Sequence, residues 1–234
     1  MNNNQIVWFT GAPGSKWSGT ANVLQSIERL NFNTTDRSPE REYKHTGPNE
    51  LSRSITHTGA YFGPGHGIGE GWEHLDQLDV ATVEKEISEG WQDSSWGKIL
   101  VKGHILTHHL DYVAETWSNN PIIMVLRPDE RCENGWFGAG GFDIFYPDYR
   151  PFYKDDDTMK RLIKEHNHCI LKFCEEREIK LHKFSSTYLR DHFKWSTDDI
   201  SDEEFREWIA KHLKHTETLN DVSIAIYRPE LLLS

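Results

Sequence analysis

The sequence is poor in features that would place it among secreted, disulfide-bonded or membrane proteins. It has only three cysteines, an odd number, so we expect reduced thiols and a cytoplasmic location. Its longest apolar runs, near residues 99–101 and 122–126, are too short to cross a bilayer. Residues 1–5 contain neither a basic stretch nor an apolar leader, so we expect neither secretion nor a membrane partner.

Basic residues are also scarce relative to acidic ones. The chain has 26 Lys and Arg against 37 Asp and Glu, which gives a formal net charge of −11. Proteins that bind nucleic acids usually neutralise phosphates with lysine and arginine, so we expect no nucleic-acid partner. An anionic ligand would have to be held at a local basic site.

The length and the apolar pattern predict one α/β domain over residues 1–234. Short apolar runs predict strands, and periodic apolar positions between them predict helices. We therefore expect a mostly parallel central sheet flanked by helices, with long loop excursions. The expected strands are 5–10, 98–102, 122–126, 180–185 and an edge strand at 222–227. The expected helices follow residue 18, cover 82–90 and 107–117, and follow the acidic cluster 155–158. A last helix is expected with Ser201 as its cap and Glu204 completing a capping box.

Residues 31–79 form the largest predicted excursion. The segment is polar and irregular, and glycines alternate with other residues over 59–71. Its apolar residues, Tyr61, Phe62, Ile68 and Trp72, could pack against the rest of the domain. We interpret the segment as a lid or acceptor-site loop.

A glycine-rich turn follows the first predicted strand, with the sequence Gly-Ala-Pro-Gly-Ser-Lys-Trp-Ser at residues 11–18. Glycines let backbone N–H groups converge, and the following helix adds the positive end of its dipole, so the turn is suited to bind an anion. It differs from a Walker A motif, in which a Mg²⁺-binding Ser or Thr follows the lysine directly. Here Trp17 follows Lys16, and an ordinary tight strand-to-helix turn is the alternative.

Cations stand at the ends of the next two predicted strands. Lys102 ends the strand at 98–102, and Arg127 follows the strand at 122–126. A magnesium-dependent phosphotransferase would need an aspartate at such a position, so we expect a metal-free transfer of a less charged group. His104 follows Lys102 at the edge where α/β sheets bind ligands, and it could act as a general base. A histidine that merely caps a helix is the alternative.

The order of these motifs resembles the sulfotransferases that use 3′-phosphoadenosine 5′-phosphosulfate (PAPS). The resemblance rests on the loop at 11–18, Lys-Gly-His-Ile-Leu at 102–106, Arg-Pro after the apolar strand, and the segment 180–191. It implies a P-loop-like sulfotransferase architecture with PAPS as the donor and adenosine 3′,5′-bisphosphate as the product. It also implies an acceptor hydroxyl on a carbohydrate or on a small alcohol or phenol.

The same resemblance implies roles for individual residues. His104 would be the catalytic base, with Lys16 and Lys102 beside it as catalytic cations. Arg127 would hold the 3′-phosphate, together with Asn134 at the position where the family has a serine. The residues that would bind the 5′-phosphosulfate are Gly14, Ser15, Lys16, Trp17 and Ser18.

Other functions remain open on the sequence alone. The loop approaches that of nucleoside kinases, so a nucleotide-dependent small-molecule kinase is one alternative, and a non-catalytic ligand-binding module on the same scaffold is another. The spacing of His104 and His108 also suits zinc, but no His-Glu-x-x-His signature accompanies it, and we expect no metal site. The histidines considered for such a site are His57, His66, His74, His104, His108 and His109.

Overall fold

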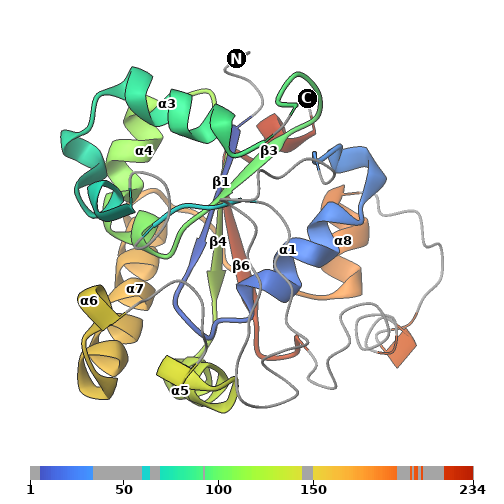
Figure 1. The fold of residues 1–234 in the computed structure, drawn as a ribbon. Helices are drawn as coiled ribbons and strands as arrows, with labels where there is room; N and C mark the ends of the chain where they lie inside the picture. Colours follow the sequence, from blue (N-terminus) through green and yellow to red (C-terminus); the bar gives the residue numbers. More distant parts are fainter. Residues whose placement is uncertain are drawn as a thin grey trace.

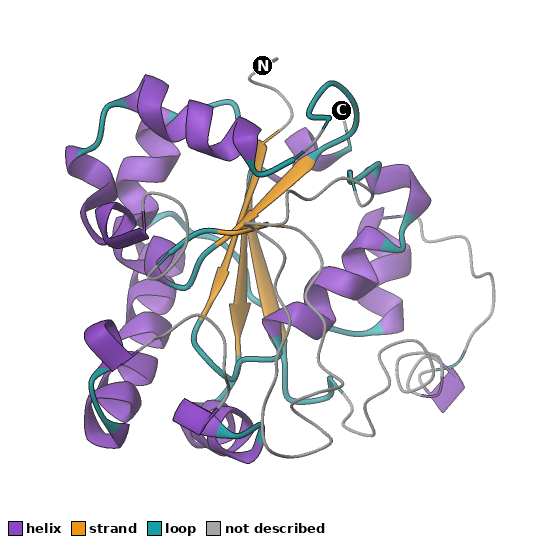
Figure 2. Ribbon diagram, viewed as in Figure 1, coloured by secondary structure: helices purple, strands orange, loops and turns teal. Residues whose placement is uncertain are grey.

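The computed structural model describes residues 6–33, 60–63, 69–91, 93–143, 150–193, 201, 203–204, 207 and 219–233. Within these residues a central sheet is covered by helices on both faces (Figures 1 and 2). The strands are β1 (Ile6–Gly11), β2 (Ala60–Tyr61), β3 (Ile99–Lys102), β4 (Ile122–Leu126), β5 (His182–Lys183) and β6 (Ser223–Tyr227). The predicted α/β class is confirmed.

The sheet is mixed but mostly parallel. Its strand order is β2-β3-β1-β4-β6-β5, and the pairs β2–β3, β3–β1 and β1–β4 are parallel. Strand β6 runs antiparallel to both of its neighbours. The prediction that 222–227 forms an edge strand is wrong, because β6 lies between β4 and β5. Strand β2 was not predicted, because its glycine-rich surroundings carry no strand pattern.

Helices and 3-10 turns connect the strands. The α-helices are α1 (Trp17–Gln25), α3 (Val80–Glu89), α4 (Leu110–Thr116), α5 (Asp129–Gly138), α6 (Arg150–Tyr153), α7 (Asp156–Glu176) and α8 (Ser186–Phe193). The 3-10 turns are η2 (Glu28–Leu30), η4 (Gly69–Gln77), η5 (Ile105–His109), η6 (Gly141–Asp143) and η7 (Pro229–Leu232). The helix predicted at 107–117 begins as η5 and continues as α4. The capping box is confirmed, since Ser201 and Glu204 bond reciprocally. No helix among the described residues is long and apolar enough to span a membrane.

The core has one layer on each face of the sheet. Helices α3, α4 and α7 lie on one face, and α1 and α8 lie on the other (Figure 1). Successive side chains of a strand point to opposite faces, so Val7 and Phe9 pack with α1 and α8, whereas Ile6 and Trp8 pack with the other layer. Burial on both faces explains why the strands read as nearly continuous apolar runs.

Parts of the predicted lid segment belong to the core. Phe32 pairs with Lys98 beside the sheet, and the rings of Phe62 and Trp72 are fully buried 4.8 Å apart. Residues 34–59 and 64–68 of this segment lie outside the described residues.

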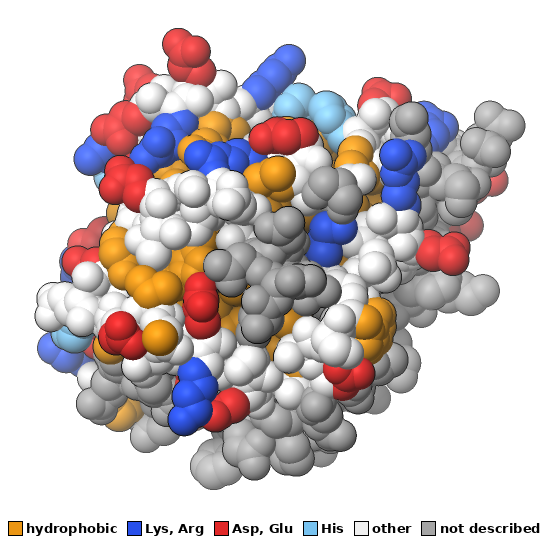
Figure 3. Space-filling view, turned by 90° about the horizontal axis from the view of Figure 1, so that it is seen from above, with side chains coloured by type: hydrophobic (Ala, Val, Ile, Leu, Met, Phe, Trp, Pro, Cys, Tyr) orange, Lys and Arg blue, Asp and Glu red, His pale blue; other side chains and the backbone are white. Residues whose placement is uncertain are grey.

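The surface viewed from above the orientation of Figure 1 carries charges of both signs. In Figure 3, basic and acidic side chains lie side by side on the described part of this face, with small apolar areas between them. This face therefore carries no charge of a single sign over its described part.

One buried side-chain amide on helix α7 forms hydrogen bonds with residues that follow β4. Asn167 Nδ2 donates to Arg127 O at 2.9 Å and to Asp129 Oδ1 at 2.6 Å. These bonds join α7 to the start of α5, and they satisfy polar atoms that are shielded from water. The position of α5 therefore depends on Asn167.

We predict that Asn167→Ala lowers the free energy of unfolding by about 1–3 kcal/mol, because it removes a buried donor from two acceptors. Urea denaturation measures the change. His168 is exposed on the same helix, so the control His168→Ala should stay within about 0.5 kcal/mol of the wild type. Equal losses in the two variants would contradict the role assigned to Asn167.

Candidate functional site

The parallel register of β1, β3 and β4 brings three chain segments to one edge of the sheet. Phe9 pairs with Lys102, and Gly11 pairs with Val125. The residues after these strands therefore emerge together, at the carboxyl edge where open α/β sheets bind ligands. We call residues 11–18 the glycine loop.

Two glycines shape the glycine loop. Gly14 has φ +76°, and a Cβ there would lie 1.9 Å from Cys132 O of α5. A Cβ on Gly11 would lie 2.8 Å from both Ser15 Oγ and Val125 O. The Ser15 amide donates to Ala12 O at 3.0 Å and closes the turn. The loop is therefore packed closely between α5 and the sheet, in a form that side chains at 11 and 14 would prevent.

The remaining loop residues lead into α1. Ser15 is fully buried, and its Oγ has no hydrogen-bond partner among the described residues. Lys16 precedes the helix with φ 62°, and both Lys16 and Ser18 are half-buried. The Trp17 ring is buried in the core against Phe9. The loop thus offers a hydroxyl, a lysine and a helix N-terminus to an anion, while the indole of Trp17 serves packing.

His104 lies directly against this loop. Its Nδ1 is 2.5 Å from Gly11 O, and because a carbonyl only accepts, Nδ1 carries the proton and Nε2 holds the lone pair of the neutral ring. The ring stacks on Trp17 with centroids 3.8 Å apart, and the residue is 5% exposed. Burial lowers the pKa of His104 to about 3; the bond to Gly11 opposes this shift and the charge of Lys102 adds to it. His104 is therefore neutral at pH 7.

Lys102 places a charge beside the same residues. It is fully buried at the end of β3, and its Nζ lies 5.6 Å from the centroid of the Trp17 ring. The backbone after it is fixed by the Thr10 hydroxyl, which donates to Gly103 O at 2.7 Å. A Cβ at position 103 would lie 2.5 Å from Phe62 O, so the spacing of Lys102 and His104 depends on a glycine between them.

A buried histidine that the sequence analysis did not single out stands behind His104. Thr107 Oγ1 donates to His104 O at 3.0 Å and also contacts His166 Nδ1 on α7. His166 is fully buried, and burial holds its pKa well below the ordinary value. The only sequence signal was the Lys-x-His pattern at 164–166, which is too common to identify the residue.

The histidines among the described residues do not form a metal site. No three His, Cys, Asp or Glu side chains among the described residues are placed to hold one metal ion. The His108 and His166 rings do lie 4.6 Å apart. Two members of the predicted set, His57 and His66, fall outside the described residues.

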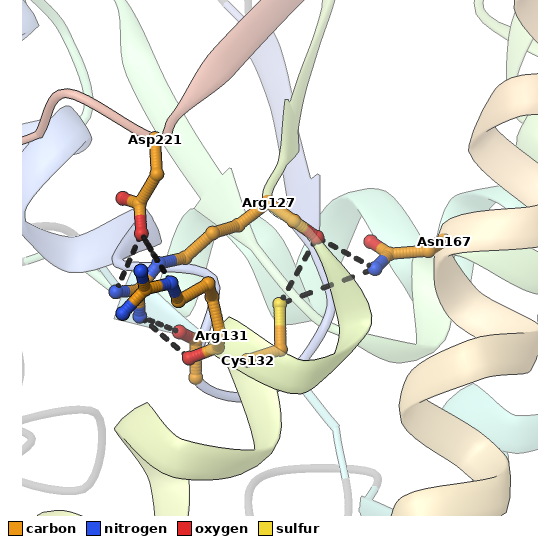
Figure 4. A network of polar contacts seen from close by, with 6 residues as sticks. Arg127, Arg131, Cys132, Asn167 and Asp221 are labelled. Carbon is orange, nitrogen blue, oxygen red and sulfur yellow. Dashed lines mark hydrogen bonds and ion pairs between the residues drawn. The ribbon is translucent and has the colours of Figure 1, made fainter.

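Arg127 lies beside the glycine loop, where its guanidinium forms hydrogen bonds and an ion pair with other residues of the protein. Its Nε and Nη2 each lie 2.9 Å from Asp221 Oδ2, and its Nη1 donates to Gly14 O at 3.1 Å and to Arg131 O at 2.7 Å (Figure 4). Asn134 is exposed on α5. The structure thus brings Arg127 into contact with the loop, whereas no hydrogen bond joins the exposed Asn134 to the loop among the described residues. It also adds Asp221, whose contribution the local motif did not predict.

Comparisons with protein-family models, with curated proteins and with solved structures find no match to the chain. Function therefore has to be inferred from the chemistry and geometry of the site.

We predict that Gly14→Ala costs about 2–4 kcal/mol of the free energy of unfolding, because alanine is strained at positive φ and its Cβ would meet backbone. A Cβ on Gly138, at the end of α5, would meet nothing within 4 Å. The control Gly138→Ala should be neutral or stabilising by up to about 1 kcal/mol. Urea denaturation of both variants tests this difference, and an unperturbed Gly14→Ala would refute the close packing of the loop.

The low pKa of His104 predicts a pH dependence of stability. Below its ordinary pKa the unfolded chain binds a proton at this residue, whereas the folded chain does so only near a pKa of about 3. Wild-type stability therefore falls as pH drops from about 6 to 4, by about 1.4 kcal/mol per pH unit for this one group. His104→Asn, which keeps a donor for Gly11 O, should show a slope shallower by that amount in urea unfolding. Parallel slopes would mean that His104 titrates normally.

Proposed function

We propose that the chain transfers a sulfuryl group from PAPS to a hydroxyl acceptor at the carboxyl edge of its parallel strands. One observation carries the proposal: a buried lysine and a neutral histidine lie directly against a glycine loop at the start of a helix. We further infer a P-loop-like sulfotransferase architecture, supported by β1 lying between β3 and β4 and leading through this loop into α1.

The glycine loop suits the 5′-phosphosulfate of the donor. The loop carries Ser15 and Lys16 and leads into the N-terminus of α1, and backbone N–H groups at a helix start favour anions. Lys102 adds a cation that is buried, so its field is weakly screened by water and salt. These groups would stabilise the negative charge that develops on the leaving phosphate oxygen.

His104 would act as the general base. Nε2 would take the proton from the hydroxyl group of the acceptor substrate while the hydroxyl oxygen forms a bond to sulfur. At the same time, the bond between sulfur and the phosphate oxygen of the donor would break. The Gly11 carbonyl holds Nδ1–H and thereby fixes the tautomer that leaves Nε2 basic. A buried imidazole is a weak base, but an adjacent anionic donor raises its pKa by favouring the protonated form.

Aromatic side chains near the loop suit an acceptor that carries a ring or a sugar. Trp136 packs edge-on against Phe137 and Phe142, with ring centroids 5.0 and 4.7 Å away. Trp136 belongs to the same core cluster as Ala12 of the glycine loop. We infer that a carbohydrate, small alcohol or phenol approaches the donor from this side.

We predict that adenosine 3′,5′-bisphosphate binds the wild type without magnesium, and more tightly than ATP with magnesium, in calorimetric titration. In a sulfuryl-transfer assay, His104→Asn should lower turnover by about 10²–10⁴-fold because a general base is lost. Its affinity for adenosine 3′,5′-bisphosphate should change little.

His182→Ala is the matched control, because His182 ends another Lys-x-His pattern, at 180–182, and lies on β5, which β4 and β6 separate from β1. It should keep wild-type turnover. Magnesium-dependent ATP consumption without sulfuryl transfer would replace the proposal with a kinase. Ligand binding without turnover of any acceptor would favour a non-catalytic module.

A further inference from the structure

Arg127 has almost no free hydrogen-bonding capacity. A guanidinium has five N–H donors. The contacts to Asp221, Gly14 O and Arg131 O engage all of them except one on Nη2. The side chain is only 6% exposed. A phosphate that accepted from more than this one remaining N–H would have to displace protein acceptors.

The charge of Arg127 is also matched inside the protein. Asp221 Oδ2 lies 2.9 Å from both Nε and Nη2, and it lies 3.9 Å from Arg131 Nε. A phosphate that approached the guanidinium would meet the carboxylate of Asp221 at short range, and like charges at that separation repel. The pair therefore presents little net positive charge to a ligand.

The contacts of Arg127 instead hold one peptide group of the glycine loop. The Gly14 carbonyl accepts from Arg127, and the Ser15 amide of the same peptide donates to Ala12 O. Both ends of the Gly14–Ser15 peptide are thus fixed, and the positive φ of Gly14 is maintained against α5. A Cβ on Gly135 would lie 2.8 Å from Arg127 Nη1, so a glycine on α5 makes room for the guanidinium.

From these contacts we propose that Arg127 is a positioning residue that holds the glycine loop in its anion-binding form, and that it does not bind the donor's 3′-phosphate. Asp221, which lies just before β6, orients the guanidinium. The inference rests on the proposed function for the identity of the donor. It implies that selection for a 3′-phosphate comes from other residues.

The test compares two nucleotides that differ only in the 3′-phosphate, adenosine 3′,5′-bisphosphate and adenosine 5′-monophosphate. Lysine cannot replace the fork of N–H donors, so Arg127→Lys should weaken binding of both nucleotides by the same factor, about tenfold or more. Asp221→Asn should weaken both by a smaller common factor. The ratio of the two affinities should stay at its wild-type value in each variant.

Direct binding of the 3′-phosphate by Arg127 predicts a different pattern. Arg127→Lys would then weaken only the bisphosphate, and Asp221→Asn would strengthen it by releasing the guanidinium. That result would overturn the proposal. The control is Arg131→Ala, which removes an exposed guanidinium from the same carboxylate but keeps the carbonyl that Arg127 contacts. It should leave both affinities within about twofold of the wild type, as expected for an exposed ion pair.

Amide hydrogen exchange over residues 11–18 gives a readout that needs no nucleotide. Faster exchange in Arg127→Lys and Asp221→Asn, but not in Arg131→Ala, supports the positioning role, and unchanged exchange refutes it. If the wild type binds neither nucleotide, the proposed donor is wrong, and the exchange result alone decides the role of Arg127. Asp221 is partly exposed, so its variant should stay folded even if Arg127→Lys does not.

Discussion

The parallel pairing of β1 with both β3 and β4 determines where the glycine loop, Lys102 and Arg127 lie. Because the three strands run in the same direction, the glycine loop, Lys102 and Arg127 leave the sheet at one edge. The β1 strand is buried along its whole length, so its register cannot slip by one residue without moving apolar side chains into the opposite layer. The strand register therefore fixes where these three segments leave the sheet.

Close packing at the carboxyl edge of the parallel strands requires glycine at two positions, independently of any role in binding a ligand. Gly14 is held against α5 and Gly103 against Phe62 O. The first contact sets the conformation of the loop, and the second sets the spacing of Lys102 and His104. The requirement is steric, so it would remain even if the ligand were other than the one proposed.

Local pattern was sufficient for those parts of the fold that depend on local sequence. The strand at 122–126 and the capping box of Ser201 and Glu204 were predicted at the residues where they occur. Strand β2 was missed because its two residues are held by pairing with β3 and not by any strand pattern of their own. The place of β6 inside the sheet depends on β5, a strand of only two residues.

The same limit applies to the candidate site. Lys102, His104 and the glycine loop were singled out correctly as neighbours, because strand ends that lie in sequence motifs can be recognised locally. Asp221 and His166 were not, since their contacts with Arg127 and Thr107 span 94 and 59 residues of sequence. A motif identifies which side chain lies at the end of a strand. The role of that side chain also depends on which residues distant in the sequence form hydrogen bonds or ion pairs with it.

The electrostatic potential at the candidate site depends in the same way on contacts between residues that are distant in the sequence. The chain as a whole is strongly acidic, and the Arg127 guanidinium is matched by Asp221, so neither supplies an attractive field for an anion. Lys102 differs because it is buried at the end of β3 within reach of the glycine loop. Water and salt screen a buried charge poorly, so a single lysine together with the N-terminus of α1 can dominate the local potential. A protein with an excess of acidic residues can thus present a local cationic site where its fold buries a lysine close to the N-terminus of a helix.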